Sequence, residues 1–336
     1  MMAEADLYVR LRRSVNEAEW NSFARASTAN SVFQTTFFGD RLVELFGWDR
    51  LYIEVVDRSA NRVVGAVAAF VAKPGSSGSF IRGMANRVRR VRSRVQWHGQ
   101  PSILPGYDPS SVTRILLDRI EERCEELSLG GVDGSQVVPG VLLPDGWTAT
   151  EWATFHVDVN RPEEEVWASL GKTARKAVRR AEKQSISVRR IKDLAELEDY
   201  YRFAVDVRAE TDRQLIGFKD FETMWRHLRG PGIYETFVAL VNGRRAAGLS
   251  VWGHGDMVTE LGAFVPQWSK DAGLNAGDAL KWNIIRWACK QEIKTYDLAG
   301  FNPDPIDEKE RLITRFKAKW GGQRVDFQFV SKTRGA

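Results

Sequence analysis

Two lysines near the C-terminal end of the chain are the residues best suited to do chemistry. Lys317 and Lys319 lie on a segment that is predicted to be a helix of about two or three turns. Phe316 precedes the first lysine and is expected to anchor the helix to the core, so that Lys317 projects near the ends of neighbouring strands. An ammonium group in such a place can stabilise negative charge that develops during a reaction.

Short-range patterns predict the elements around this helix. The segment from Thr295 to Gly300 is typical of a short strand, and a loop rich in proline and acidic residues follows it. Gly321 and Gly322 stand where the C-terminus of a helix favours a left-handed residue. A last strand is predicted at 324–330, where apolar and polar residues alternate. The region is therefore expected to form a strand–loop–helix–strand unit.

Several sequence motifs resemble those of a known family. Y-D-L-A-G at 296–300, followed by F-K-A-K-W-G-G at 316–322, is similar to the C-terminal signature of the Fem family. Three more stretches resemble motifs of that family in the same order along the chain, namely 33–48, 167–190 and 210–218. The resemblance implies a peptidoglycan-bridge aminoacyltransferase built from two domains of the GNAT (N-acyltransferase) fold.

The length of 336 residues favours two domains, since about 150 residues are typical of one. The pattern is interrupted at Asn160-Arg161-Pro162, which predicts an N-terminal domain at 1–160 and a C-terminal domain at 161–336. The resemblance implies that both are GNAT-like, so the expected fold class is α/β (α+β), with mixed sheets flanked by helices in two tandem domains. Asn242-Gly243 predicts a β-hairpin in the second domain.

The resemblance also implies roles for residues of the C-terminal domain. Transfer of an aminoacyl group from a tRNA ester to an amine requires mainly that the tetrahedral oxyanion and the departing ribose oxygen be stabilised. Lys317 matches the family's lysine and is expected to do this, with a surface lysine as the alternative. Asp297 is the second catalytic candidate, and either orients the incoming amine or caps the strand end. Tyr296 and Phe316 are candidates for substrate binding, although Tyr296 would also suit the core.

Two arginines are candidates for binding an acceptor that carries phosphate. Arg213 matches the arginine of the family's T-x-x-R motif, and the resemblance places it near the diphosphate of a nucleotide-linked or lipid-linked acceptor, where a planar guanidinium suits phosphate oxygens. A salt bridge on a helix surface is the alternative. The family's N-terminal phosphate-binding lysine would fall near Leu42, where the neighbouring Arg41 is the candidate to replace it.

Positive charge is concentrated in two segments, although the net charge is only +5. Arg82–Arg94 contains six arginines and no acidic residue, and Lys172–Arg190 contains eight basic residues and one glutamate. Local positive fields of this kind attract RNA, anionic lipid headgroups or diphosphates, unless they are simply solvated faces. With the resemblance, they suggest aminoacyl-tRNA as the donor and a phosphate-bearing cell-wall or polysaccharide precursor as the acceptor.

No cofactor and no metal ion are expected. A GNAT enzyme that uses coenzyme A holds the pyrophosphate on backbone amides at a helix N-terminus, in a turn with the pattern Q/R-x-x-G-x-G/A. Lys270-x-x-Gly273-x-Asn275 matches this pattern only in part, because a side chain stands where close approach favours none. An acyl-CoA is therefore the less favoured donor. Cys124 and Cys289 lack the spacing of a disulfide framework or a zinc site.

Neither a signal peptide nor a membrane span is predicted. The first residues are acidic where a signal peptide is basic, and the longest apolar run, Val63–Ala72, is half the length of a span. We expect a cytoplasmic protein, with peripheral contact with the inner face of an anionic membrane as an alternative.

Three functional hypotheses follow. The preferred one is a Fem-like acyltransferase that moves an aminoacyl or other acyl group to an amine acceptor, such as a cell-wall precursor. The first alternative is a GNAT acetyltransferase that uses acyl-CoA and acts on a polysaccharide or other precursor. The second is a non-catalytic protein that binds RNA or anionic headgroups through its basic segments.

Overall fold

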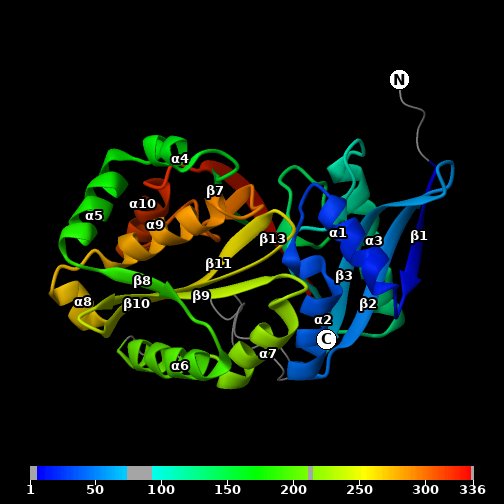
Figure 1. Ribbon diagram of the computed structural model, residues 1–336. Helices are drawn as coiled ribbons and strands as arrows, with labels where there is room; N and C mark the ends of the chain where they lie inside the picture. The colour runs from blue at the N-terminus through cyan, green and yellow to red at the C-terminus, as the bar shows by residue number, and fades with distance from the viewer. Residues whose placement is uncertain (1–5, 74–92, 211–214, 334–336) are drawn as a thin grey trace. The chain divides into compact units, whose positions relative to one another are not determined.

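The computed structural model describes residues 6–73, 93–210 and 215–333 (Figure 1). The chain divides into two compact units, the first formed by residues 1–152 with 326–336 and the second by residues 153–325. The predicted domains, 1–160 and 161–336, differ from these units at both ends of the second domain. The chain leaves the first unit within one strand and returns to it within another, which the sequence did not indicate.

The first unit is a mixed sheet with helices on both faces. Its strand order is β1-β2-β3-β4-β6-β13, antiparallel except for the parallel pair β4 and β6, and β5 pairs with β3. The strands are β1 (Leu7–Arg12), β2 (Asp49–Asp57), β3 (Arg62–Ala72), β4 (Arg94–Trp97), β5 (Ser102–Ile103), β6 (Gly131–Val137) and β13 (Gln323–Thr333). The helices are α1 (Glu17–Ala26), the short 3-10 helix at Val32–Gln34, α2 (Thr36–Phe46) and α3 (Pro109–Glu126).

Alternation along β2 explains why helices cover both faces of this sheet. Leu51, Ile53 and Val55 belong to the core beneath α3, whereas Tyr52 packs against Trp20 of α1 on the other face. Side chains of a strand point to opposite faces in turn, and β2 is buried at every position from Leu51 to Asp57, so both faces of the sheet are covered.

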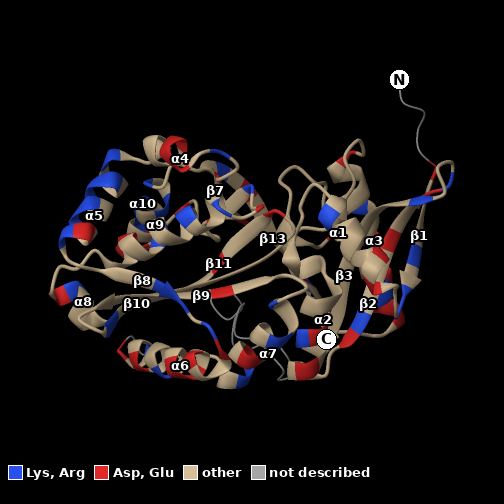
Figure 2. Ribbon diagram, viewed as in Figure 1, with Lys and Arg blue, Asp and Glu red and all other residues tan. Residues whose placement is uncertain are grey.

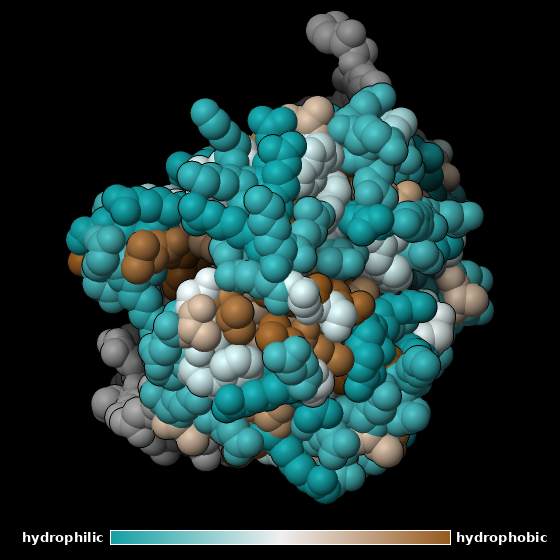
Figure 3. Space-filling model, turned by 60° about the vertical axis from the view of Figure 1, so that its left-hand side comes forward, coloured by the Kyte–Doolittle hydropathy of each residue, from teal (hydrophilic) through white to brown (hydrophobic). Residues whose placement is uncertain are grey.

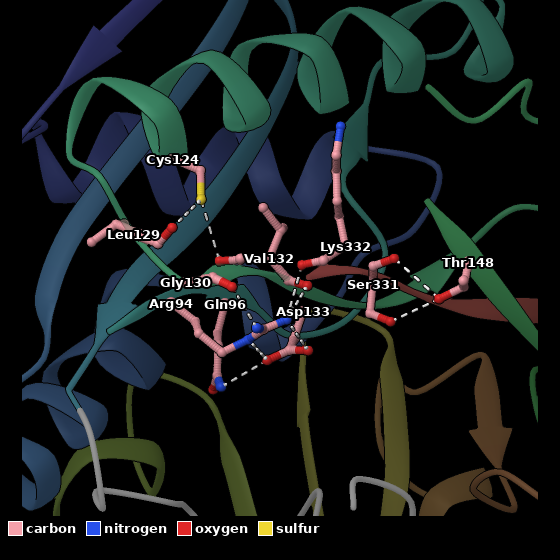
Figure 4. A network of polar contacts seen from close by, with 11 residues as sticks. Arg94, Gln96, Cys124, Leu129, Gly130, Val132, Asp133, Thr148, Ser331 and Lys332 are labelled. Atoms are coloured by element: carbon pink, nitrogen blue, oxygen red, sulfur yellow. Dashed lines mark hydrogen bonds and ion pairs between the residues drawn. The ribbon is translucent and has the colours of Figure 1, made fainter. Parts of the chain in front are cut away.

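A buried arginine attaches the C-terminal strand to this unit (Figure 4). Arg94 on β4 donates to both carboxylate oxygens of Asp133 on β6, at 2.8 and 3.2 Å, and to the carbonyl oxygens of Gly130, Val132 and Lys332. The guanidinium therefore joins three strands, and Lys332 is brought to it by the pairing of β13 with β6. This explains why residues 326–333 belong to the first unit.

The position of Arg94 also corrects one expectation from the sequence. The sequence predicts one positive field over Arg82–Arg94, but residues 82–92 lie outside the described part of the chain. Arg94 itself is only 5% exposed and is paired with Asp133. It cannot contribute to an exposed basic surface.

The second unit is a mixed sheet in the order β7-β12-β11-β10-β9-β8, in which only β11 and β12 are parallel. The strands are β7 (Thr148–Asp158), β8 (Ser187–Arg190), β9 (Ile233–Val241), β10 (Arg244–His254), β11 (Met257–Phe264) and β12 (Thr295–Asp297). The helices are α4 (Glu163–Ser169), α5 (Lys172–Lys183), α6 (Leu194–Ala209), α7 (Phe218–Leu228), α8 (Gln267–Asp271), α9 (Ala276–Cys289) and α10 (Glu308–Ala318).

Helices α5 and α9 cover one face of this sheet, and α6 and α7 cover the other (Figure 1). The main core lies under α9, where Leu280, Ile284 and Ile285 meet Val258 and Tyr296 of the central strands. The predicted hairpin is confirmed, since β9 and β10 pair across Asn242-Gly243 and both residues have positive φ. None of the helices in the described ranges is both long and apolar enough to cross a membrane.

The parallel pairing of β11 with β12 covers only three residues of each strand, ending at Thr259 and Asp297. Strand β11 continues to Phe264, whereas the chain after β12 turns away at Leu298. The two strands therefore part at this point. Polar side chains from β7, β11, β12, α9 and α10 lie near the point where the strands part.

Replacing Arg94 tests its structural role. Arg94→Met would remove the buried cation that donates to the Asp133 carboxylate and to three carbonyl groups, and we expect a loss of about 3 kcal/mol in the free energy of unfolding of the first unit. Urea denaturation would measure it, together with amide exchange in β6 and β13. Arg114→Met, which removes a surface pair with Asp118, serves as the control and should cost less than about 1 kcal/mol. Equal effects of the two changes would contradict this role.

Candidate functional site

The turn that follows β12 is held in an uncommon backbone conformation. Ala299 has a φ of +61°, which costs a residue with a side chain about 1–2 kcal/mol. Its N–H donates to Asp297 Oδ1 at 2.9 Å, and its carbonyl oxygen accepts from Thr154 Oγ1 at 2.9 Å. These contacts hold the carbonyl groups of Ala299 and Gly300 in place.

Asp297 lies 3% exposed at the centre of these contacts. Thr154 Oγ1 also lies within hydrogen-bond distance of its Oδ1, Thr259 Oγ1 donates to its Oδ2 at 3.1 Å, and His156 Nε2 lies 3.9 Å from Oδ1. Both carboxylate oxygens are therefore occupied by the protein itself. Of the two roles expected for Asp297, these contacts match the strand-end cap.

Lys317 reaches the same turn from the other direction. Its Nζ donates to the carbonyl oxygens of Ala299 and Gly300, each at 2.8 Å, and the side chain is half-buried. Burial lowers the pKa of Lys317 to about 8, and the nearby Lys281 also lowers it, while Glu260 and Asp297 act to raise it. An ammonium group has three donors, so one N–H remains for a substrate.

The ends of α10 fix where Lys317 stands. The helix begins at the cap Asp307, whose side chain accepts from the N–H of Glu310 at 2.8 Å. It ends near Gly321, which has a φ of +76° as predicted, and the N–H of Gly171 donates to the carbonyl oxygen of Lys319 at 2.9 Å. Between these ends Phe316 packs against the core beside Trp320, which agrees with its expected role as an anchor.

Lys319, the second lysine of the motif, is bound differently. Its ammonium pairs with the carboxylate of Asp278 on α9 and lies 4.2 Å from the centre of the Phe316 ring. Lys317 contacts backbone carbonyls instead, which do not neutralise its charge. Of the two lysines, Lys317 is therefore the one whose charge is available to a substrate.

A buried charged group that the sequence did not reveal lies next to Phe316. Lys281 of α9 and Glu260 of β11 form an ion pair, and they are 3% and 8% exposed. Tyr296 donates its hydroxyl proton to the same Glu260 oxygen at 2.6 Å. The only signals in the sequence are a lysine on the apolar face of one helix and a glutamate within an apolar strand.

Tyr296 differs from its prediction as a substrate-binding residue. Its side chain is fully buried, and burial together with the Glu260 carboxylate raises the pKa of the Tyr296 phenol. A phenol in this state stays protonated and acts as a hydrogen-bond donor within the core.

The two arginines expected to bind phosphate stand differently in the structure. Arg213 lies outside the described residues. Arg41 belongs to the first unit, on α2, where it is 7% exposed with its guanidinium 5.8 Å from the centre of the Phe38 ring. Their proposed contacts with phosphate stay predictions.

Helix α5 presents a positive face (Figure 2). It buries Ala174, Val178 and Ala181 against the core and directs its basic residues outward. Among the residues that the structure describes, no ion pair engages any of these six, Lys172, Arg175, Lys176, Arg179, Arg180 and Lys183. Figure 3, with the side that carries α5 turned forward, shows a mostly hydrophilic surface with hydrophobic side chains gathered near its middle.

A pocket of about 300 Å³ lies between α5, β8 and α9, and Lys317 is not among its lining residues. It is lined mainly by apolar side chains, among them Val178, Val188 and Trp282. None of the groups around Ala299 and Gly300 contributes to it. The pocket is therefore separate from the lysine site.

The loop that enters α9 is occupied by the protein's own side chains. Gln184, at the end of α5, accepts from the backbone N–H of Asn275 at 2.9 Å and donates to the carbonyl oxygen of Gly273 at 3.1 Å. Asp278 adds a carboxylate in the first turn of α9. In a GNAT enzyme that uses coenzyme A, pyrophosphate oxygens would accept from amides at such a place.

The Asp297 contacts generate a prediction. Asp297→Asn would place an amide NH₂ against one of the donors Thr154, Thr259 and the N–H of Ala299, so we expect a loss of about 1–3 kcal/mol in the free energy of unfolding. Urea denaturation followed by tryptophan fluorescence would measure it. Asp304→Asn, an exposed acid in the loop before α10, is the matched control and should leave stability unchanged. An Asp297→Asn protein as stable as the wild type would show that these hydrogen bonds do not hold the turn.

Residues 168–324 match the family model for the acetyltransferase (GNAT) domain. The matched segment lies within the second unit and includes Lys317, Asp297, Glu260 and Lys281. No curated protein matches the chain.

Three solved structures show the fold of the whole chain. FemX is similar with a TM-score of 0.73 and 14% identity, covering 96% of each chain. A tandem GNAT protein from the clavulanic acid biosynthesis pathway has a TM-score of 0.55 and 13% identity, covering 98% of this chain and 99% of its own. The C-terminal domain of a putative lysylphosphatidylglycerol synthetase from Agrobacterium fabrum has a TM-score of 0.55 and 12% identity, covering 95% and 93%.

At these sequence identities the structural similarity establishes the fold. The match of residues 168–324 to the family model supports the assignment to acyltransferases. The resemblance found in the sequence is thereby confirmed at the level of fold and enzyme class. Residues 168–324 form an acetyltransferase (GNAT) domain, and the whole chain has the fold of FemX and of the tandem GNAT protein, with two GNAT-like units in tandem.

Proposed function

We propose that this protein transfers an aminoacyl group from aminoacyl-tRNA to an amine acceptor, with Lys317 as the oxyanion partner. The observation that carries the proposal is the anchoring of the Lys317 ammonium on two backbone carbonyls with one N–H left over. A cation that is fixed before the reaction, in partly dehydrated surroundings, stabilises developing negative charge without reorganising.

The reaction needs little more than this. The neutral amine attacks the ester carbonyl carbon, and the carbonyl oxygen becomes an oxyanion. This oxyanion accepts a hydrogen bond from the remaining N–H of Lys317. The intermediate then breaks the bond to the ribose oxygen, an amide forms, and the proton lost by the amine ends on that oxygen. Alignment of the two substrates supplies much of the remaining rate.

Two features favour a tRNA donor over coenzyme A. Gln184, Asn275 and Asp278 occupy the entrance of α9, where the pyrophosphate of coenzyme A would need free amides and no neighbouring carboxylate. The six cations of α5 offer a field that suits a polyanion much larger than coenzyme A.

The acceptor is inferred more broadly, as an amine on a phosphate-bearing molecule such as a cell-wall or polysaccharide precursor. FemX gives the best fold match among the three structures, and another relative is named for lysylphosphatidylglycerol, an aminoacyl group on an anionic lipid. These names support acceptors that carry negative charge. Arg213 and Arg41 stay the candidates for binding it.

An acyl-CoA-dependent acetyltransferase is the second candidate. The match of residues 168–324 to the acetyltransferase (GNAT) domain favours it. Both candidates place Lys317 at the reacting carbonyl, so the nature of the donor distinguishes them.

Lys317→Met tests the catalytic role. Loss of the ammonium should lower the single-turnover rate on the order of a hundredfold or more, because an oxyanion partner is lost, while acceptor affinity measured by calorimetry changes little. Lys309→Met, an exposed lysine on the same helix, is the control and should keep full activity. An unchanged rate for Lys317→Met would remove this residue from the mechanism.

The donor can be tested through salt. Binding of aminoacyl-tRNA should weaken steeply with salt, and Lys176→Gln with Arg180→Gln should reduce the slope of log K against log salt by about 0.7–0.9 for each lost phosphate contact. Arg119→Gln with Arg123→Gln removes the same charge from α3 and should not change the slope. A radiolabelled aminoacyl group should move from tRNA to an amine. Saturable binding of acetyl-CoA with acetyl transfer would favour the second candidate.

A further inference from the structure

We propose that Lys281 and Glu260 are positioning residues for the reaction, which hold the Phe316–Lys317 segment of α10 at the strand end and set the charge around the Lys317 ammonium. This inference rests on the proposed role of Lys317. Neither residue is predicted by the sequence motifs, and neither contacts the turn at Ala299 and Gly300.

The geometry connects the pair to Lys317 through Phe316. The Lys281 ammonium lies 5.6 Å from the centre of the Phe316 ring and 6.0 Å from that of Tyr296. The Lys319 ammonium lies 4.2 Å from the same Phe316 ring. The ring that precedes Lys317 therefore contacts two cations, and cation–π attraction fixes its orientation.

Contacts on both faces of the sheet hold the turn at Ala299 and the helix α10 beside it. Val258 pairs with Tyr296 and Thr259 with Asp297, so Glu260 and Tyr296 point to the α9 face, whereas Thr259 and Asp297 point to the other. On one face Asp297 fixes the backbone of Ala299. On the other, Glu260 accepts from Lys281 and Tyr296, next to Phe316.

The energetics give a reason to look for a function. A buried ion pair costs several kcal/mol of desolvation per ion, and apolar residues of similar volume in its place are often as stable or more so. Lys281 stands between Leu280 and Trp282, which are both buried in the core. Stability alone therefore does not account for a lysine here.

Three charged groups act on Lys317. Asp297 of β12 and Glu260 of β11 favour its charged form, and Lys281 of α9 disfavours it. Lys319, two positions further along α10, is paired with Asp278. Since Glu260 and Lys281 act in opposite directions, the intact pair has a small net effect, and removal of one member should have a larger one.

The sign of the effect follows from the role of the ammonium. In the wild-type enzyme, kcat/KM should fall as pH rises through about 8, because Lys317 then loses the proton it needs. Lys281→Met removes a repelling charge, so the alkaline limb, which is the pH at which kcat/KM falls, should move upward by about half a pH unit or more. Glu260→Gln removes an attracting charge, so the limb should move downward, or stay in place if Lys281 becomes neutral as well.

The double variant Lys281→Met with Glu260→Gln removes both charges and should bring the limb back near its wild-type position. It also guards against misfolding, since no charge is left buried without a partner. Lys281→Arg, which keeps the cation, should leave the limb in place. A purely structural pair would lower the rate in every variant without moving the limb, and that outcome would overturn the proposal.

A measurement without substrate separates this inference from the proposed function. The pH dependence of acetic anhydride labelling at Lys317, read by mass spectrometry of its peptide in the full chain, reports the titration of this amine directly. The same upward shift is expected in Lys281→Met. If labelling shifts but no acyl transfer from tRNA is found, the proposed function fails and the pair keeps its role. If labelling is the same in wild type and Lys281→Met, the inference fails, whatever the activity.

Discussion

The hydrogen bond from the N–H of Ala299 to the Asp297 carboxylate is the interaction on which the site depends. It holds a residue with a side chain in a left-handed conformation, and Thr154 and Thr259 hold the carboxylate in turn. The Lys317 ammonium donates hydrogen bonds to the two carbonyl oxygens that this turn presents. Because the parallel pairing of β11 and β12 stops at Asp297, the turn lies where these two strands part.

Charge in the second unit is divided between two environments. Lys281, Glu260 and Asp297 are buried, so their influence on Lys317 is little screened by salt. The cations of α5 are largely solvated, and their effect on a polyanion is long in range but sensitive to salt. The first group suits control of chemistry at one atom, and the second suits capture of a large donor.

Helix α9 links these two environments. Its entrance is occupied by Gln184 from the end of α5, its first turn holds Lys319 through Asp278, and its middle carries Lys281. A GNAT fold in which these positions serve the protein itself has less room for a nucleotide pyrophosphate at the start of this helix. In the proposed function, the same helix supports catalysis by fixing α10.

The sequence alone predicted the local elements and one residue of the site. The hairpin at Asn242-Gly243 and the end of α10 near Gly321 depend on backbone preferences of a few neighbouring residues, and Phe316 next to Lys317 suggested a lysine anchored at a strand end. Tertiary structure alone decided that Glu260 and Lys281 meet, that Asp297 is enclosed by Thr154 and Thr259, and that Arg94 is buried rather than part of a basic surface. Such pairs join segments far apart in the chain, and their energies arise only when packing removes them from water.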